Sequence, residues 1–237
     1  MSVFSNPVKV GNVFIGGEHP LVLQSMTNTD TNDIHRSVEQ CMRIFDAGAQ
    51  LVRLTTRNRK EVESLGKIRK LLRKKGYGQP LCADVHFLPK VAEEAAKIVE
   101  KVRINPGNYI ERKYTGPTFF SAQEKKRHLD KIRENILPLL NICYEHDTAI
   151  RIGVNHGSLS ERILSWYGNT PEGMVESAME FLEIFNQENF HRVIVSLKAS
   201  NVKIMVFANR FLVRRMQEEG YRYPVHLGVT EAGSDED

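Results

Sequence analysis

The sequence predicts an α/β protein, most simply a TIM (β/α)8-type barrel that stops after its seventh strand and follows a β-hairpin. Short apolar runs alternate with longer amphipathic segments along most of the chain, a pattern typical of βα units around a parallel sheet. The length of 237 residues suits one such barrel. A doubly wound open sheet is the second choice, because Gln24–Asn32 lacks the glycine-rich phosphate loop expected after its first strand.

The order of elements starts with the hairpin. Val8–Val10 and Val13–Ile15 flank Gly11 and Asn12, a pair suited to a tight turn. The strands expected after it are Leu21–Ser25, Leu51–Thr55, Leu81–His86, Val102–Asn105, Ala149–Asn155, Arg192–Ser196 and Val225–Thr230. The helices expected between them are Ile34–Ala47, Lys60–Lys75, Lys90–Val99, Ala122–His146, Pro171–Asn186 and Val202–Glu219.

The end of the sequence bears on the domain organisation. The last residues, E-A-G-S-D-E-D, follow the seventh expected strand, and neither an eighth strand nor a closing helix comes after them. A (β/α)8 barrel needs both. We therefore expect one incomplete barrel domain over residues 1–237 and a longer protein of which this chain is a portion.

The composition is that of an ordinary globular protein, with 41% hydrophobic residues, 26% charged residues and a formal net charge of +4. No apolar run approaches the roughly 18 residues of a membrane helix, and the start lacks a secretory signal, so we expect a cytoplasmic protein without membrane contact. The basic run Lys67–Lys75 has no interleaved aromatic residues and predicts a solvated helix face rather than nucleic-acid binding. Cys41, Cys82 and Cys143 lack metal or disulfide spacing and are expected as buried apolar residues.

Polar side chains gather where five of the expected strands end, which is where barrel enzymes build their sites. Because successive strand side chains alternate between faces, the polar residues of one strand share a face opposite its aliphatic residues. In Ala149–Ser158, Arg151 and Asn155 lie opposite Ile150 and Ile152. The other strands pair Arg53 with Thr55, Asp84 with His86, Arg103 with Asn105, and Ser196 with Lys198 in the same way.

The interior expected from this alternation is positively charged. A buried unpaired charge costs several kcal/mol, so a bound anion is the expected complement. Arginine binds phosphate or carboxylate bidentately, and several cations on separate strands suit a diphosphate. For any one residue the alternative is a structural ion pair, such as Arg53 with Asp84. The cations are Arg53, Arg103, Arg151 and Lys198, and the candidate anions are Asp84 and Glu231.

A metal site is a second interpretation of the same polar residues. Asp84 and His86 present two ligand types on one strand face, and His156 and Glu231 could join them. Hydrogen bonding to a polar ligand, or proton transfer, needs the same residue types and leaves the cations a role. We therefore expect no metal ligands in this chain.

Six blocks of the sequence form a recognisable series: Leu51–Leu54, Ala83–Phe87, Val102–Asn108, Ile150–Leu159, Val195–Ser200 and His226–Gly233. In their order and spacing they resemble the 4-hydroxy-3-methylbut-2-enyl diphosphate synthases. These are iron-sulfur enzymes of the non-mevalonate pathway of isoprenoid biosynthesis. The stretch N-H-G-S-L followed by S-E-R-I-L-S-W-Y resembles the longer form of the enzyme, which carries an inserted domain after the barrel.

The resemblance implies an N-terminal barrel that binds 2-C-methyl-D-erythritol 2,4-cyclodiphosphate and an oxidoreductase that converts it to the allylic diphosphate with two electrons. It also implies a C-terminal domain in which three cysteines and a glutamate hold a [4Fe-4S] cluster, and an electron donor such as ferredoxin or flavodoxin. It leaves a homodimer open. The sequence has no cysteine motif for the cluster, so we expect the substrate residues but no reductase activity in this chain alone.

The resemblance also assigns roles by motif position. For Glu231 it implies an acid near the reacting carbons, a candidate proton donor, and a partner of an arginine is the alternative. The residues that match the diphosphate side are Arg53, Arg103, Arg151, Lys198 and Ser200, and those that match polar groups around the substrate are Asp84, His86, Asn105 and Asn155.

Two other functional classes stay open. A pterin-binding transferase barrel also uses interior Asp, Asn, Lys and Arg at strand ends, and would hold its ring through Asp84 and Asn105. A noncatalytic phosphate-binding module would need the same cations without any reaction.

Overall fold

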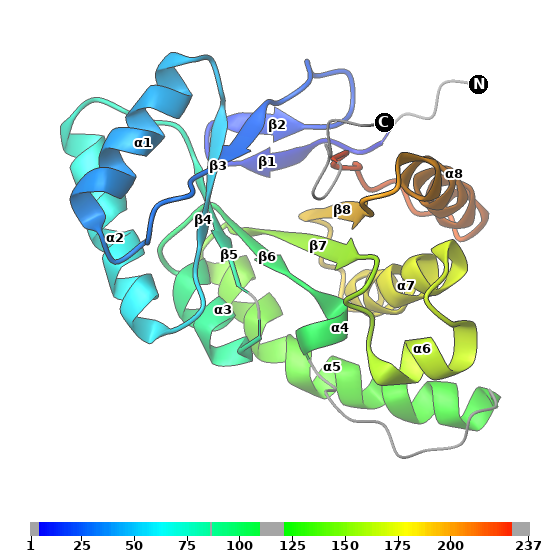
Figure 1. Cartoon of the computed structure of the whole chain (residues 1–237). Helices are drawn as coiled ribbons and strands as arrows, with labels where there is room; N and C mark the ends of the chain where they lie inside the picture. Colours follow the sequence, from blue (N-terminus) through cyan, green and yellow to red (C-terminus); the bar gives the residue numbers. More distant parts are fainter. Residues whose placement is uncertain (1–4, 86, 110–120, 229–237) are drawn as a thin grey trace.

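The computed structural model describes residues 5–85, 87–109 and 121–228. Its centre is a curled sheet of six parallel strands, each hydrogen-bonded to the next strand in sequence, with helices around its outer side (Figure 1). This is the arrangement of a βα barrel, and it confirms the predicted fold class. The strands are β3 (Gln24–Met26), β4 (Leu51–Thr55), β5 (Leu81–Asp84), β6 (Lys101–Ile104), β7 (Ala149–Asn155) and β8 (Val193–Lys198).

The N-terminal hairpin is confirmed and has a structural role. Strands β1 (Val8–Val10) and β2 (Val13–Ile15) pair antiparallel, and Gly11 takes the positive φ of 58° that the turn requires. The hairpin covers the amino-terminal end of the sheet interior with apolar contacts. The buried cluster there consists of Val8, Val10, Leu51, Cys82, Ala149 and Ile194.

The predicted helices all form, with boundaries shifted by a few residues at most. Two short helices, α4 (Pro106–Tyr109) and α6 (Glu161–Tyr167), were not predicted, because four and seven residues are too few to show a helical period. Helix α7 begins as expected, with Thr170 accepting a hydrogen bond from the Gly173 amide. The remaining helices are α1 (Ile34–Asp46), α2 (Arg59–Lys74), α3 (Pro89–Ala96), α5 (Ala122–Glu145), α7 (Pro171–Gln187) and α8 (Val202–Glu218).

The core lies between the outer face of the sheet and the helices. Ile150, Ile152 and Val154 of β7 are fully buried in the same apolar cluster as Val175 and Ala178 of α7. Burial of each large aliphatic side chain contributes about 1.5–3 kcal/mol. Since these three residues face the helices, the alternate residues of β7 must face the interior of the sheet.

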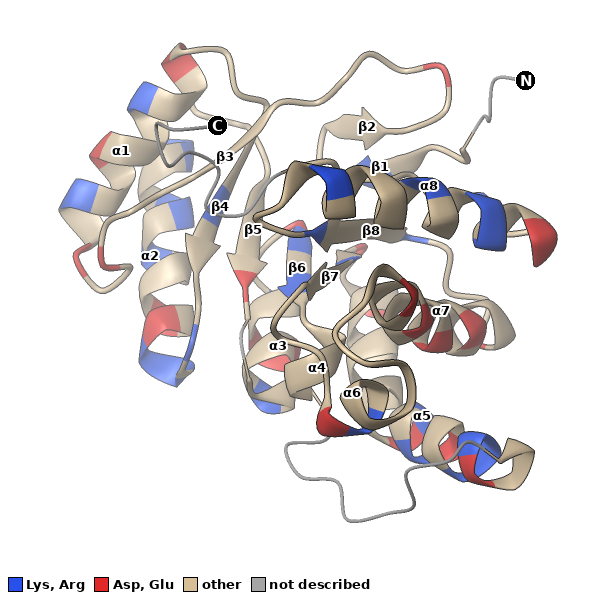
Figure 2. Ribbon diagram, turned by 45° about the vertical axis from the view of Figure 1, so that its right-hand side comes forward, with Lys and Arg blue, Asp and Glu red and all other residues tan. Residues whose placement is uncertain are grey.

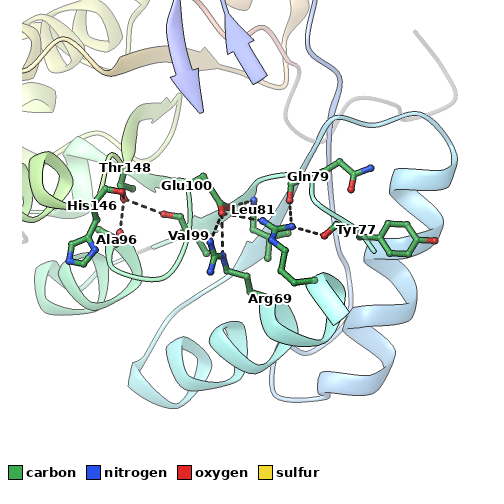
Figure 3. A network of polar contacts seen from close by, with 10 residues as sticks. Arg69, Tyr77, Gln79, Leu81, Ala96, Val99, Glu100, His146 and Thr148 are labelled. Atoms are coloured by element: carbon green, nitrogen blue, oxygen red, sulfur yellow. Dashed lines mark hydrogen bonds and ion pairs between the residues drawn. The ribbon is translucent and has the colours of Figure 1, made fainter. Parts of the chain in front are cut away.

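A polar network ties down the loops at the amino-terminal ends of β5, β6 and β7 (Figure 3). The Glu100 carboxylate accepts hydrogen bonds from Arg69 at 2.9 Å, Arg73 at 3.1 Å and the Leu81 amide at 2.9 Å. The Thr148 hydroxyl donates to the carbonyl of the last residue of α3 at 2.6 Å. These contacts fix the start of the strands whose other ends carry the site.

The two outermost predicted strands differ from the structure. β3 begins at Gln24 rather than Leu21, since its pairing with β4 starts at Gln24 and Leu51, and the side chains of Leu21 and Leu23 are exposed. In its described part, the predicted strand 225–230 is a single parallel bridge from Val225 to Val195. Within the described residues no strand pairs with both β3 and the segment at Val225. The sheet therefore does not close into a full barrel there. Among the described helices, none has the length and apolarity to cross a membrane.

Candidate functional site

The polar faces of β4 to β8 converge on the interior of the curled sheet. Parallel pairing places Asp84, Arg103 and Arg151 side by side on β5, β6 and β7. Figure 2 shows positive segments on β4, β6 and β8 and a negative segment on β5. The alternation inferred from the sequence therefore brings the predicted charged residues together.

One carboxylate serves two arginines. Asp84 accepts a hydrogen bond from Arg103 Nη1 at 3.1 Å, and its other oxygen lies 3.4 Å from Arg53 Nε. Arg103 Nη2 also donates to the Gly153 carbonyl at 2.8 Å, and the Arg53 guanidinium contacts the Met26 sulfur at 2.8 Å. Arg53 and Asp84 thus form the ion pair considered from the sequence, and Asp84 holds both guanidinium groups in place.

Arg151 is the least compensated charge in this interior. Its side chain is buried, and neither Nε nor Nη1 has a hydrogen-bond partner within the described residues. Burial, with the neighbouring charge of Arg53, lowers the pKa of Arg151 to about 9, so the group stays charged at neutral pH. A fully desolvated guanidinium with vacant donors is the kind of group that an anionic ligand would satisfy.

Two lysines add to the positive charge. Lys198, at the end of β8, is half-buried, and burial together with Arg151 lowers its pKa to about 8. Lys101 was missed, because the strand was expected to begin one residue later, at Val102. Its position two residues before Arg103 could have revealed it, since both residues then share a face. Lys101 is fully buried, donates to Gln24 Oε1 at 2.6 Å, and has its pKa lowered by burial to about 7.

These residues form a cluster that we name the cation cage. In the described part of the chain, Asp84 supplies the carboxylate that pairs with cations of this cluster. Even with Lys101 neutral, the positive charges outnumber the negative one. The cation cage consists of Arg53, Lys101, Arg103, Arg151 and Lys198.

A cavity of about 600 Å³ opens beside the cation cage, between segments 15–24 and 224–228. Lys101, Lys198 and His226 line it. Burial and the surrounding cations lower the pKa of His226 to about 2, so its imidazole is neutral. The cavity lies where the described sheet does not close, and it exposes the side of the cage to a ligand or to another protein segment.

The uncharged candidates occupy different depths. Asn105 is buried, and its Oδ1 accepts a hydrogen bond from the Gly107 amide at 3.2 Å at the start of α4. Asn155 is half-buried at the end of β7, and Ser200 is exposed beyond β8. Ser196, which the alternation placed on the polar face, is buried with a hydroxyl that has no partner in the described structure.

Two candidates, His86 and Glu231, lie outside the described residues. The metal interpretation that rests on them is therefore untested, as is the role of Glu231. Within the described residues, no group of three His, Cys, Asp or Glu side chains could hold a metal ion. His156 is half-buried, and its Nε2 contacts the Asn169 carbonyl at 3.1 Å.

The cysteines do not fit an iron-sulfur cluster. Cys41, Cys82 and Cys143 are buried on three separate elements, α1, β5 and α5. Burial raises the pKa of the Cys41 and Cys143 thiols to about 12, whereas a cluster is held by thiolates. These three residues pack as small apolar groups, and they do not supply cluster ligands.

Comparison with protein families and curated sequences gives consistent matches. Residues 5–237 match the GcpE TIM-barrel domain. A 4-hydroxy-3-methylbut-2-en-1-yl diphosphate synthase (flavodoxin) of Phocaeicola vulgatus is 54% identical over 237 residues, which are 98% of this chain and 38% of that protein. The chloroplastic ferredoxin-type synthase of Oryza sativa subsp. japonica is 46% identical over 231 residues, covering 97% of this chain and 31% of that protein. The chain thus spans less than two fifths of the length of these relatives.

Solved structures support the fold at low sequence identity. The catalytic domain of a Streptomyces sp. SirexAA-E mannanase has a TM-score of 0.56 and 12% identity, covering 99% of this chain and 74% of that chain. A type I 3-dehydroquinate dehydratase from Clostridium difficile has a TM-score of 0.55 and 13% identity, covering 95% and 81%. Likeness at this identity concerns the fold alone.

Proposed function

Since the chain belongs to the family of the GcpE TIM-barrel domain, we propose that it is the substrate-binding barrel of a 4-hydroxy-3-methylbut-2-enyl diphosphate synthase. In this proposal the cation cage binds the diphosphate of 2-C-methyl-D-erythritol 2,4-cyclodiphosphate. The observation that carries it is the charge imbalance, with several buried cations around the single carboxylate of Asp84 in the described interior. A bound diphosphate would balance these charges and satisfy their vacant donors.

The contacts divide the proposed work among the cations. Arg53 and Arg103 are held by Asp84, so they present fixed positive charge. Arg151 keeps Nε and Nη1 without partners in the described structure and is the principal proposed binder. Lys198 ends β8, and the exposed Ser200 follows it two residues later. At this end of the strand Lys198 would meet the outer oxygens of the diphosphate. Asp84, His86, Asn105 and Asn155 are proposed around the rest of the substrate, with Glu231 as proton donor.

The redox half of the reaction is proposed to lie outside this chain. Opening the cyclic diphosphate needs two electrons, and the buried, separate cysteines here do not provide cluster ligands. We assign the [4Fe-4S] cluster and the contact with flavodoxin or ferredoxin to the remaining length of the protein. The 237-residue chain is then one incomplete barrel domain that binds substrate without turnover. A cytoplasmic location accompanies this proposal, because unpaired cysteines and flavodoxin-type donors are typical of a reducing compartment.

The test is substrate binding by the 237-residue chain, measured calorimetrically with the cyclic diphosphate and with inorganic diphosphate. We expect Arg151→Gln to weaken both affinities about 10- to 100-fold, the worth of charged hydrogen bonds. Arg214→Gln, at an exposed position of α8, makes the same charge change outside the cage. It should leave both affinities within about twofold of those of the unaltered chain. Absence of binding, or equal effects of the two variants, would contradict the proposal.

The same proteins separate the alternatives. A pterin-binding barrel is less favoured, because the carboxylate of Asp84 already binds two arginines. A fluorescence titration with a pterin would nevertheless detect it. A noncatalytic module would bind diphosphate, but Arg151→Gln in the full-length protein would then leave the reconstituted reductase reaction unchanged, whereas we expect turnover to fall with affinity.

A further inference from the structure

One residue on the interior face of β7 has no side chain. Arg151, Gly153 and Asn155 alternate with the buried aliphatic residues of this strand, so a side chain at position 153 would point into the cation cage. The φ of Gly153 does not lie in the left-handed region that favours glycine. The backbone therefore does not require glycine here, and the reason must be space.

The space is filled by Arg103. Its guanidinium crosses β7 over Gly153, where Nη2 donates to the Gly153 carbonyl at 2.8 Å. A Cβ atom on residue 153 would lie 2.4 Å from Arg103 Nε and 3.2 Å from its Cγ and Cζ. Heavy atoms do not approach to 2.4 Å without a bond, so a methyl group and the present Arg103 exclude each other.

Arg103 cannot give way at low cost. Its Nη1 is bound to Asp84 at 3.1 Å, its side chain is only 7% exposed, and Arg151 lies beside it on the neighbouring strand. Two of the atoms that would clash, Nε and Cζ, belong to the guanidinium itself and the third, Cγ, to its stem, so turning the terminal nitrogens alone does not relieve the contact. A methyl group would instead break the hydrogen bonds that orient the guanidinium.

Two other glycines provide the contrast. A Cβ on Gly228 would approach Lys198, but at its flexible end, 2.9 Å from Nζ, which can move aside. A Cβ on Gly66 in α2 would meet Ile98 at 3.7 Å, an ordinary contact. Of these three glycines, Gly153 is the one at which an added side chain would collide with a group that other contacts hold in place.

We propose that Gly153 is a positioning residue for the anion site: its bare Cα and its carbonyl seat the Arg103 guanidinium against Asp84, in the orientation that binds diphosphate. This inference rests on the proposed function, since it assumes that the cation cage binds such a ligand. It concerns a residue that touches no ligand itself and acts through Arg103.

The test is a double-mutant cycle of Gly153→Ala and Arg103→Ala in the 237-residue chain. Affinity for inorganic diphosphate is measured by calorimetry, and the unfolding midpoint is measured without ligand. We expect Gly153→Ala to weaken binding about 10-fold or more when Arg103 is present, and less than about twofold in the Arg103→Ala background. Gly66→Ala is the control for replacing a glycine by alanine. We expect it to lower neither the affinity for diphosphate nor the unfolding midpoint.

The outcomes separate the two proposals. If the unaltered chain does not bind diphosphate, the proposed function fails, and the unfolding cycle alone still tests whether Gly153 seats Arg103. If it binds, and Gly153→Ala weakens binding equally in both backgrounds, the positioning role is wrong and the effect belongs to the strand. If Gly153→Ala does not fold but the double variant does, the role is supported. If neither folds, the role is rejected.

Discussion

In its described part the structure buries arginine in two regions, and the two regions compensate its charge differently. Between α6 and α7, Arg162 binds Glu180 through two parallel hydrogen bonds of 2.8 and 2.6 Å, and both side chains are 4% exposed. The Arg162 guanidinium also lies 4.9 Å from the ring centre of Trp166. In the cation cage, Arg151 is buried as deeply but has two nitrogens without a partner in the described structure.

The presence or absence of an anionic partner distinguishes a structural buried arginine from one that we expect to bind a ligand. Burial removes the same hydration from both guanidinium groups, so each needs a compensating anion. The chain supplies that anion for Arg162 and does not supply it for Arg151 in its described part. Removing one partner of a matched pair leaves a buried uncompensated charge, whereas an unmatched cation lowers stability until a ligand binds. The same substitution in the two regions should therefore have opposite effects.

The largest expected effect is that of Arg162→Met. The variant leaves the Glu180 carboxylate buried without its partner, and we expect the free energy of unfolding to fall by about 3 kcal/mol or more. Urea unfolding followed by circular dichroism measures the change. Affinity for diphosphate, determined on the folded fraction, should stay within about twofold, because the pair lies outside the cage. A loss below about 1 kcal/mol would remove the distinction between the two regions.

Arg151→Met should have a smaller effect of opposite sign. Replacing an uncompensated buried cation by an apolar side chain of similar length relieves its desolvation, so we expect the ligand-free protein to gain about 1 kcal/mol. The gain should vanish when diphosphate is added, since the ligand binds the unaltered protein more tightly and therefore stabilises it more. Loss of stability comparable to that of Arg162→Met would show that Arg151 has an anionic partner of its own.

The sequence allowed the fold and the convergence of the charged side chains to be predicted, because both follow from alternation along strands. Two-residue periodicity placed Arg53, Asp84, Arg103 and Arg151 on one interior face, as the structure has them. The contact between Gln24 and Lys101 was not predicted, and it spans 77 positions of the chain. Such a contact depends on the curvature of the sheet, which a local pattern does not contain.

What could not be predicted depends on side-chain geometry. Either arginine could have taken Asp84 alone, and only the structure shows that one carboxylate holds both. The seat that Gly153 provides for Arg103 is equally a property of atoms in space, since glycine in a strand has several meanings. The apolar run at Leu21–Leu23 resembled a strand but lies outside the ladder, because pairing with β4 sets where β3 begins.

The smallest expected effect concerns the pH dependence of stability, through Lys101. Its pKa is about 7 in the folded protein against an ordinary value of 10.5, so above pH 7 the unfolded chain binds more protons than the folded one. Stability must then rise as the pH increases from 7 towards 10.5. Between pH 7 and 8 Lys101 makes the largest contribution, because Lys198 and Arg151 titrate higher, at about 8 and 9, and His226 at about 2.

We therefore expect the unaltered chain to gain about 1 kcal/mol of unfolding free energy between pH 7 and 8, close to the limit for one proton. Lys101→Met should remove most of this gain and raise stability at pH 7, because no buried ammonium remains at position 101 to be desolvated. Urea unfolding at several pH values measures both. If Lys101→Met leaves the pH dependence of the unfolding free energy unchanged, Lys101 keeps its charge in the folded protein. It would then add a further uncompensated positive charge to the cation cage.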